Sequence, residues 1–414
     1  MSTGLERVWS GLVRAGDGVI AWLDRLLTSC GKLWLPLVLW SALLLSFVTA
    51  MPNLGIFMYP AGQGYLEKIE DPWRDMRADY RDRQHESKLN LRLTVPLTLN
   101  MLGINHPLAL GVVCILAVLG LWAWTGAFLE KVSGDRVVGA LFVLYLAQTY
   151  VGMFGWPFLN YDSVALLLVV AGFCRWPPGL NTLWIFLALW TDERAFVAAL
   201  FPLFYHLVRR VETPRERWLC AGGVLLAYAL AVATRFWVTA VTGLETPTSG
   251  VVTVWMLGHL MEFAHIGILY SLEGGWLLVA AAVLLAWTAG RRWLALGFTV
   301  LVGLQYGTGF TAADVSRNLS YLMPAAFCAA LLFLELEPDR QARRRLMLVV
   351  AVVSFLLSNY VIFGYLHQDE NAKGWVRWIR PLPVDVVEQA VQERYPAPAY
   401  TRPSQPDPSD PPED

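Results

Sequence analysis

Acidic side chains stand at the ends of the apolar segments of this chain, where they could act as general bases or bind hydroxyl groups. A carboxylate at hydrocarbon depth costs about 2.5 to 3.5 kcal/mol on insertion scales, so a group of them predicts a polar cavity. A topology count places all of these acids at one face of a membrane. They are Glu70, Asp71, Asp162, Asp192, Glu193, Glu262 and Asp314.

The composition is that of a polytopic membrane protein. Of the 414 residues, 56% are hydrophobic and 16% are charged, whereas a soluble domain carries about 25% charged residues. Recurring apolar runs predict an all-α bundle of about eleven transmembrane helices. The net charge of −1 argues against a nucleic-acid-binding footprint. The irregular spacing of the five cysteines supports neither a disulfide framework nor a zinc site.

The positions of lysine and arginine orient these segments. More than half of the 32 basic residues fall in the N-terminal stretch and in the short connections that share its face. The positive-inside rule therefore predicts a cytoplasmic N-terminus and a C-terminus outside. Because the fourth to sixth segments are short, we expect them to be tilted or broken. The segments are 33–57, 107–129, 136–156, 161–175, 178–190, 194–208, 217–242, 275–290, 293–310, 317–335 and 346–366.

The chain divides into three predicted regions. Residues 1–32 carry apolar side chains at helical spacing with arginines on other faces, which is typical of an amphipathic helix on the cytoplasmic surface. Residues 33–366 form the transmembrane domain and include a long outer loop, 58–106. Residues 367–414 form an outer tail, which is rich in Pro, Asp and Ser from about residue 395 and is predicted to be disordered there.

The outer loop carries the acidic pair Glu70-Asp71. Apolar residues from Leu66 to Tyr80 recur every three or four positions, which predicts an amphipathic helix in the membrane interface. Asp71 precedes Pro72, the usual order of an N-cap and a first helical residue. Two interpretations follow: Asp71 caps a helix, or one acid of the pair is a general base at the membrane surface.

Charged residues at other segment ends also have structural interpretations beside the functional one. Asp162 suits a helix N-terminus, where the helix dipole stabilises an acid. Asp192, Glu193 and Arg194 lie between two short apolar segments, either as a cap neutralised by the arginine or as a buried charged site. Arg92 could snorkel to the interface or meet an anionic head group.

Later in the chain, Asp314 and Arg317 are three residues apart and could pair on one helix face. Arg317 could instead hold a phosphate at a helix N-terminus. Glu262 and His265 also share a face, and a hydrogen-bonded pair explains them better than a metal site, because two residues do not complete a ligand set. Arg235 requires a partner within the protein or a head group. We therefore predict no metal and no other cofactor.

Three stretches of the chain carry a family resemblance. They are LNLRLTVPLTLNMLG at 89–103, YDSVALLL with TDERAFVAALFPL within 161–203, and ADVSRNLSYLMPA at 313–325. Together with the acidic pair and amphipathic helix of the first outer loop, they resemble a large bacterial branch of the GT-C class of membrane-embedded glycosyltransferases. The resemblance spans most of residues 30–366.

The resemblance implies an enzyme of the plasma (bacterial inner) membrane. It would move a sugar from a polyprenyl-phosphate donor to a glycan or lipid acceptor at the outer face. In that class a carboxylate of the first outer loop acts as the base in an inverting transfer, and Glu70 and Asp71 match its position. We predict that substrate binding involves Asp162, Asp192, Glu193, Arg194, Arg235, His265, Asp314 and Arg317.

Two other classes of protein compete with this interpretation. A lipid or glycan transporter, or flippase, should have pseudo-symmetric halves, and the sequence contains no detectable repeat. A non-catalytic membrane scaffold subunit would use all of the acids as helix caps. The acids gather at one face rather than mid-span, which also argues against a transporter. Of the three classes we favour the enzyme.

Overall fold

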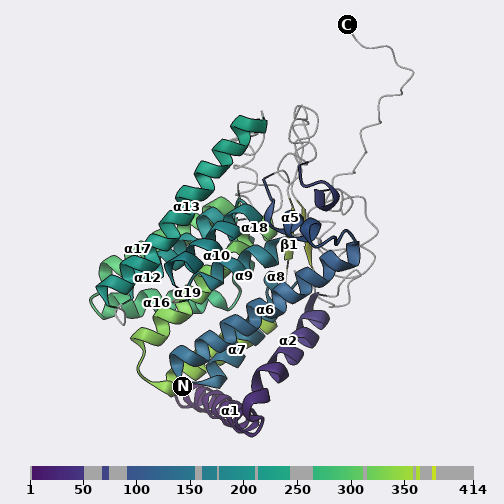
Figure 1. The fold of residues 1–414 in the computed structure, drawn as a ribbon. Helices are drawn as coiled ribbons and strands as arrows, with labels where there is room; N and C mark the ends of the chain where they lie inside the picture. The colour runs from purple at the N-terminus through teal and green to yellow at the C-terminus, as the bar shows by residue number, and fades with distance from the viewer. Residues whose placement is uncertain are drawn as a thin grey trace.

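The structure, a computed structural model, describes residues 2–50, 68–73, 91–153, 161–174, 177–209, 213–242, 264–310, 315–357, 360–363 and 375–378. These residues are mainly helical (Figure 1). The helices are α1 (Ser2–Ser29), α2 (Trp34–Ala50), α5 (Thr94–Met101), α6 (Pro107–Ser133), α7 (Arg136–Gln148), α8 (Tyr150–Met153), α9 (Asp162–Ala171), α10 (Pro178–Thr191), α11 (Ala195–Ala198), α12 (Leu200–Val208), α13 (Pro214–Thr242), α15 (Ala264–Ser271), α16 (Gly275–Thr288), α17 (Arg292–Gly309), α18 (Val315–Leu319), α19 (Met323–Leu336) and α20 (Arg340–Leu356).

Each predicted apolar segment contains a helix, but most of these helices are shorter than a membrane is thick. Within the described residues, three helices are long and apolar enough to cross a bilayer: Ala109–Ser133, Pro214–Thr242 and Arg317–Leu336. By contrast α7, α9, α10 and α16 have 13, 10, 14 and 14 residues, or about 15 to 21 Å against a hydrocarbon core of about 30 Å. The chain thus has the helices of a membrane protein, and the prediction of eleven spans is not confirmed.

The predicted end of the last apolar segment is wrong. The sequence predicts one apolar span over 346–366, whereas α20 ends at Leu356 and strand β1 (Tyr360–Phe363) follows. β1 pairs antiparallel with β2 (Trp375–Trp378). Both strands are rich in β-branched and aromatic residues, which favour strands. The tail from residue 379, including the part predicted to be disordered, lies outside the described residues, as does most of the outer loop.

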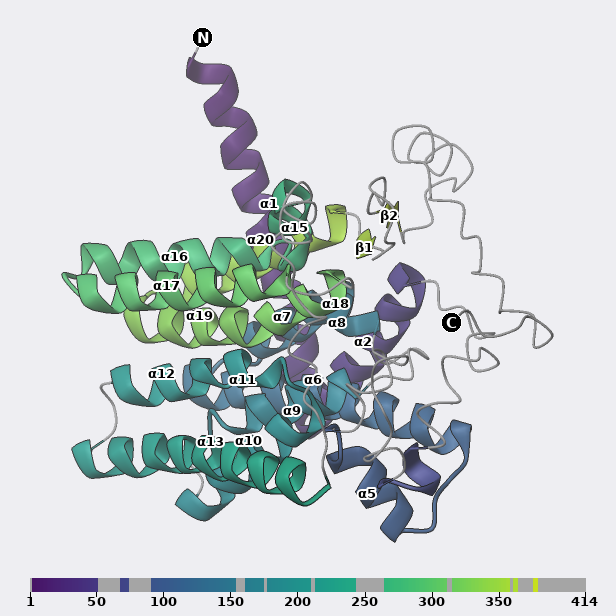
Figure 2. The same cartoon turned by 90° about the horizontal axis from the view of Figure 1, so that it is seen from above.

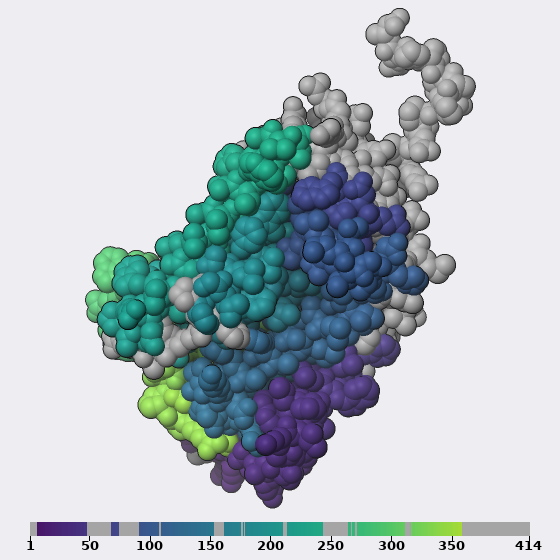
Figure 3. Space-filling view, in the orientation of Figure 1, coloured from purple at the N-terminus to yellow at the C-terminus, as the bar shows by residue number. Residues whose placement is uncertain are grey.

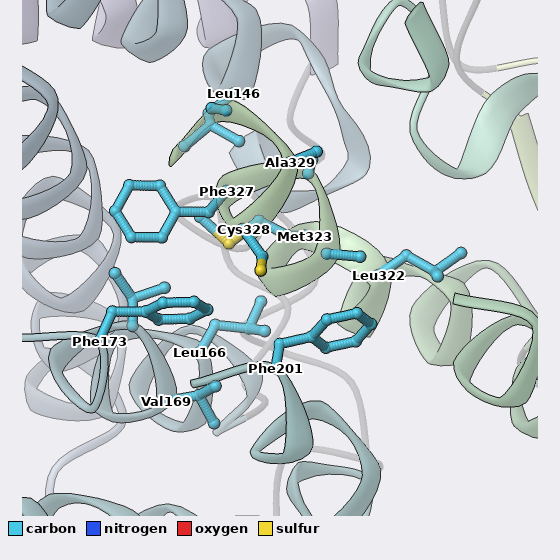
Figure 4. Close-up of a cluster of buried hydrophobic side chains, with 14 of the residues drawn as sticks. Leu146, Leu166, Val169, Phe173, Phe201, Leu322, Met323, Phe327, Cys328 and Ala329 are labelled. Atoms are coloured by element: carbon cyan, nitrogen blue, oxygen red, sulfur yellow. The ribbon is translucent and has the colours of Figure 1, made fainter. Parts of the chain in front are cut away.

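Helix α19 forms the centre of the bundle. All its residues from Met323 to Leu334 are buried, as expected for a helix that is apolar on every side. The ring of Phe327 lies 5.1 Å, centroid to centroid, from that of Phe173 (Figure 4). It lies 5.8 Å from the ring of Phe128 and 5.8 Å from that of Phe142. Tilted and edge contacts of this kind are favourable aromatic geometries, and they hold α6, α7 and the turn after α9 around α19.

The remaining helices stack in layers. Helices α16, α17 and α19 lie side by side in one layer, and α10, α12 and α13 lie in another (Figure 2). Helices α6 and α7 form a tight hairpin, in which a Cβ atom on Gly139 would lie 2.5 Å from the carbonyl oxygen of Gly126. Glycine is required at this crossing because any larger residue would push the two backbones apart.

Connections rich in arginine meet at one end of the bundle, called the basic end here. Asp135, the N-cap of α7, accepts hydrogen bonds from Arg340 at 2.8 Å and from Arg344 at 2.6 Å. Arg344 also bonds Asp24 of α1 at 2.9 Å, so α1 and α20 lie together at this end (Figure 3). Burial raises the pKa of Asp135, but the hydrogen bonds and charges of the two arginines outweigh burial and lower that pKa below its usual value.

Arg291, between α16 and α17, belongs to the same end. It pairs with Glu335 of α19 at 3.0 Å and donates to the carbonyl of Val208, the last residue of α12, at 2.8 Å. Since α12 and α19 both finish at the basic end, the chain that precedes each helix lies at the opposite end. That chain includes Arg194 and Arg317.

Candidate functional site

Six charged side chains from four separated stretches of the chain meet at the end opposite the basic end. The stretches are the turn before α5, the first residue of α9, the break between α10 and α11, and α18. Burying a charge is costly unless an opposite charge and hydrogen bonds accompany it, and each of these side chains has such a partner. We call them the charged network: Arg92, Asp162, Asp192, Glu193, Arg194 and Arg317.

Arg194 makes the most connections within this network. Its Nε and Nη2 atoms bond the two carboxylate oxygens of Asp192 at 2.7 and 2.6 Å, a bidentate geometry that fixes both side chains. Nη2 also lies 2.6 Å from Oδ1 of Asp162, and Nη1 donates to Oδ1 of Asn318 at 3.0 Å. The guanidinium carbon lies 4.8 Å from the ring centroid of Tyr321. Arg194 therefore joins α9, the α10–α11 break and the α18–α19 region.

Asp162 connects two arginines from distant parts of the sequence. Its side chain is fully buried, and its Oδ2 atom accepts a hydrogen bond from Nε of Arg317 at 2.7 Å. Asp162 is the first residue of α9, which confirms the predicted position at a helix N-terminus, where an acid is stabilised. The predicted pair of Asp314 with Arg317 involves a residue outside the described part of the chain, and Arg317 pairs with Asp162.

Arg92 is a member that the sequence interpretation missed. Its Nε and Nη2 atoms bond the carboxylate of Glu193 at 3.0 and 2.5 Å, and its Nη1 atom lies 3.2 Å from Asp192. The side chain is 7% exposed, whereas that of Glu193 is 44% exposed. Arg92 thus binds within the protein, and neither snorkelling nor head-group binding is needed to explain it. Glu193 forms the open side of the network.

The backbone break after α10 sets up these contacts. The helix ends at Thr191, and Asp192 adopts an extended conformation with φ −155° and ψ 137°. Its Oδ1 atom accepts the backbone N–H of Arg194 at 3.0 Å, a local bond that aspartate characteristically makes outside helices. Arg194 thus neutralises Asp192, as the capping interpretation predicts, but Arg194 itself is the N-cap of α11, without a side-chain cap bond. The interpretation of this stretch as a functional charged site stays a prediction.

Arg235 lies next to the network rather than within it. On α13, its guanidinium carbon lies 4.8 Å from the ring centroid of Phe196 and 5.5 Å from that of Trp190. Its Nη2 atom donates to the carbonyl of Leu189. The partners of Arg235 are thus aromatic faces and a carbonyl of the last turn of α10, both of which attract a cation.

The acidic pair of the outer loop is exposed and held by specific hydrogen bonds. Oδ1 of Asp71 accepts the backbone N–H of Trp73 at 3.1 Å; the helix that it would cap lies outside the described residues, so the capping interpretation stays a prediction. The side-chain amide of Asn100 donates to the carbonyls of Ile69 and Glu70, both at 3.0 Å. The side chains of Glu70 and Asp71 are both exposed, so their carboxylates are accessible to a substrate.

Packing places the acidic pair at the same end as the charged network. Ile69 is buried in a small apolar cluster with Val95, Leu99 and Tyr161. Tyr161 directly precedes Asp162. The outer loop therefore rests on the start of α9, one residue from the network.

Other predicted site residues do not join this arrangement. His265 is exposed on α15, and the network bonds described above do not include it. Asp314 and Glu262 lie outside the described residues, so their roles and the predicted Glu262–His265 pair stay predictions.

Two uncharged residues near Arg194 were also missed. Asn318 binds Arg194 and donates to the carbonyl of Gly309 at 3.2 Å. The hydroxyl of Tyr321 is buried without a hydrogen-bond partner in the described part of the structure. Only their position within four residues of Arg317 in the sequence could have drawn attention to them.

Among the described residues, no group of three or more His, Cys, Asp or Glu side chains is placed to hold a metal ion. No family model, curated protein or solved structure matches the chain. The site is thus a paired, largely buried ion network beside two exposed carboxylates.

Proposed function

We propose that this protein is a membrane glycosyltransferase. It moves a sugar from a polyprenyl-phosphate donor to a glycan or lipid acceptor, at the face of the membrane where the charged network lies. That face is the outer one if the basic end is cytoplasmic, as the positive-inside rule predicts. The general base is Glu70 or Asp71.

The observation that carries the proposal is the meeting of the three stretches that resemble the GT-C class. Arg92 belongs to the first, Asp162 and Arg194 to the second, and Arg317 to the third. These four residues are linked through shared ion pairs. A scaffold that used its acids only as separate helix caps would not need arginines that link one acid to another.

The chemistry fits the exposed acids and the buried arginines. The acceptor oxygen attacks the anomeric carbon while the bond from that carbon to the phosphate oxygen breaks. The proton of the acceptor moves to the carboxylate of Glu70 or Asp71, a general-base step that contributes about 100-fold or more. The phosphate leaves with the electron pair, and its charge is stabilised by Arg317 and Arg194. Asp162 orients both guanidinium groups.

Transfer by reconstituted protein tests this proposal. A panel of labelled polyprenyl-phosphate sugars is supplied to proteoliposomes that contain a bacterial membrane lipid extract as the acceptor source. We expect label to move to an acceptor and polyprenyl phosphate to be released. The Glu70→Gln/Asp71→Asn double variant should transfer about 100-fold more slowly, with unchanged insertion and melting temperature.

The matched control is Glu6→Gln/Glu130→Gln, which removes two carboxylates elsewhere in the chain and should transfer at the wild-type rate. Equal rates for the acidic-pair variant and the wild type would remove the proposed base. Passage of unmodified donor across the bilayer, without transfer, would favour a transporter and contradict the enzyme.

A further inference from the structure

Helix α1 presents three different sides, and one of them packs on the bundle. Ile20 and Leu27, seven residues and therefore two turns apart, are buried in the core. On the same side of α1, Asp17 bonds Arg345 of α20 at 2.7 Å. Asp24 bonds Arg344, which also belongs to α20. The acidic residues of this part of α1 are thus used in contacts with α20.

A second side of α1 is an exposed apolar row. Val8, Leu12, Val19 and Trp22 are spaced by four, seven and three residues, which places them along one side of the helix. They are 64, 62, 48 and 57% exposed. An apolar row of this length is unfavourable in water and is typical of helices that lie in the membrane interface.

A third side carries a basic row. Arg7, Arg14 and Arg25 are separated by seven and eleven residues, close to two and three helical turns. All three are exposed. Nε of Arg14 and of Arg25 donates to a carbonyl of the preceding turn of α1, at 3.2 and 3.3 Å. These bonds hold the two guanidinium groups along the helix, so the exposed surface of α1 is positively charged there.

The direction of α1 suits a membrane surface. It joins the apolar helix α2 through a bend of 117°. When α2 runs into the bilayer, α1 therefore lies along the membrane surface. Exposed Lys32 at the bend extends the positive charge of the basic row. The N-terminal part of α1 projects beyond the other helices (Figure 2), which leaves its apolar and basic rows accessible.

We infer that the exposed side of α1 is a docking surface for anionic lipid. The apolar row inserts among the acyl chains at the basic end of the bundle, and the basic row binds the phosphates of anionic head groups. Clusters of arginine beside a membrane helix attract anionic lipid electrostatically, and this attraction adds to apolar insertion. This surface is independent of the glycosyltransferase proposal, because it lies at the opposite end from the charged network.

Electron paramagnetic resonance of the full chain in nanodiscs tests the inference. A spin label is attached at Leu12→Cys in the apolar row or at Ser10→Cys on another side, both in a Cys30→Ser background. The nanodiscs contain phosphatidylcholine alone or mixed with phosphatidylglycerol. With phosphatidylglycerol, the label at position 12 should collide mainly with oxygen and the label at position 10 mainly with a water-soluble nickel complex.

A charge variant separates lipid attraction from simple apolar insertion. Arg14→Gln/Arg25→Gln should lower the ratio of docked to undocked α1 by roughly 30-fold in the phosphatidylglycerol discs. The matched control Arg215→Gln/Arg292→Gln, with both arginines exposed on other helices, should leave that ratio unchanged. A label at position 12 that meets the nickel complex in both lipids would overturn the inference. Docking that is equal with and without phosphatidylglycerol would also overturn it.

Discussion

At the scale of residues, Asp162 connects the parts of the candidate site. It is fully buried and pairs with both Arg194 and Arg317, which come from separate stretches of the chain. A buried ion pair contributes little net stability, because the attraction only offsets the cost of desolvation. Removing only the acid is different, because the arginines then stay in the protein interior with less negative charge to offset theirs.

We therefore expect Asp162→Asn to destabilise the protein strongly. The free energy of unfolding should fall by about 3 to 5 kcal/mol, since two buried guanidinium groups lose a shared carboxylate. The control Glu130→Gln breaks the exposed pair with Arg136, whose side chains are 30 and 38% exposed, and should cost about 0 to 1 kcal/mol. Denaturant unfolding in mixed micelles measures both. A loss for Asp162→Asn as small as that of the control would contradict the description of the network.

The sequence located five of the six network residues because ionisable groups at the ends of apolar segments are rare and conspicuous. Arg92 was missed as a site residue because a lone arginine among leucines also suits snorkelling, and its partner Glu193 is 101 residues away. Asn318 and Tyr321 carry no charge and give no such signal. Which residues pair could not be predicted, because pairing depends on how the layers of helices bring their ends together.

At the scale of elements, apolar runs predicted where helices occur but not how long they are. The run 194–208 forms two helices, α11 and α12, and 136–156 contains α7 and α8. The α7–α8 break falls at Thr149, whose backbone is extended and whose hydroxyl donates to the carbonyl of Leu146 at 2.8 Å. The α11–α12 break precedes Pro202, which has no backbone N–H to continue the helix. Helix α19 is enclosed by the protein, so apolarity on all sides reflects burial among helices as well as contact with lipid.

The contact of α1 with α20 should be sensitive to acid. Hydrogen bonds from Arg345 and Gln341 lower the pKa of Asp17 to about 2, against about 3.9 in an unfolded chain. Because the folded state has the lower pKa, this contact stabilises the protein above about pH 4, and the effect is lost as the pH falls from there through about 2. Thermal melting across this range should fall more steeply for the wild type than for Asp17→Asn. Parallel curves would contradict the ion pair.

At the scale of the whole molecule, charged residues gather at the two ends of the bundle. The basic end gathers α1, the α6–α7 and α16–α17 connections and the start of α20. The opposite end gathers the charged network and the exposed acidic pair. This separation is what a membrane enzyme with one polar active face requires, and it is the arrangement on which the proposed transfer depends.

A structure of the full chain in nanodiscs with added polyprenyl phosphate tests that arrangement most directly. We predict that the phosphate lies within hydrogen-bond distance of Arg317, Arg194 or Arg235, and that the carboxylate of Glu70 or Asp71 faces it across the site. A phosphate bound only at the basic end, or an acidic pair that faces away from the bound lipid, would contradict the account.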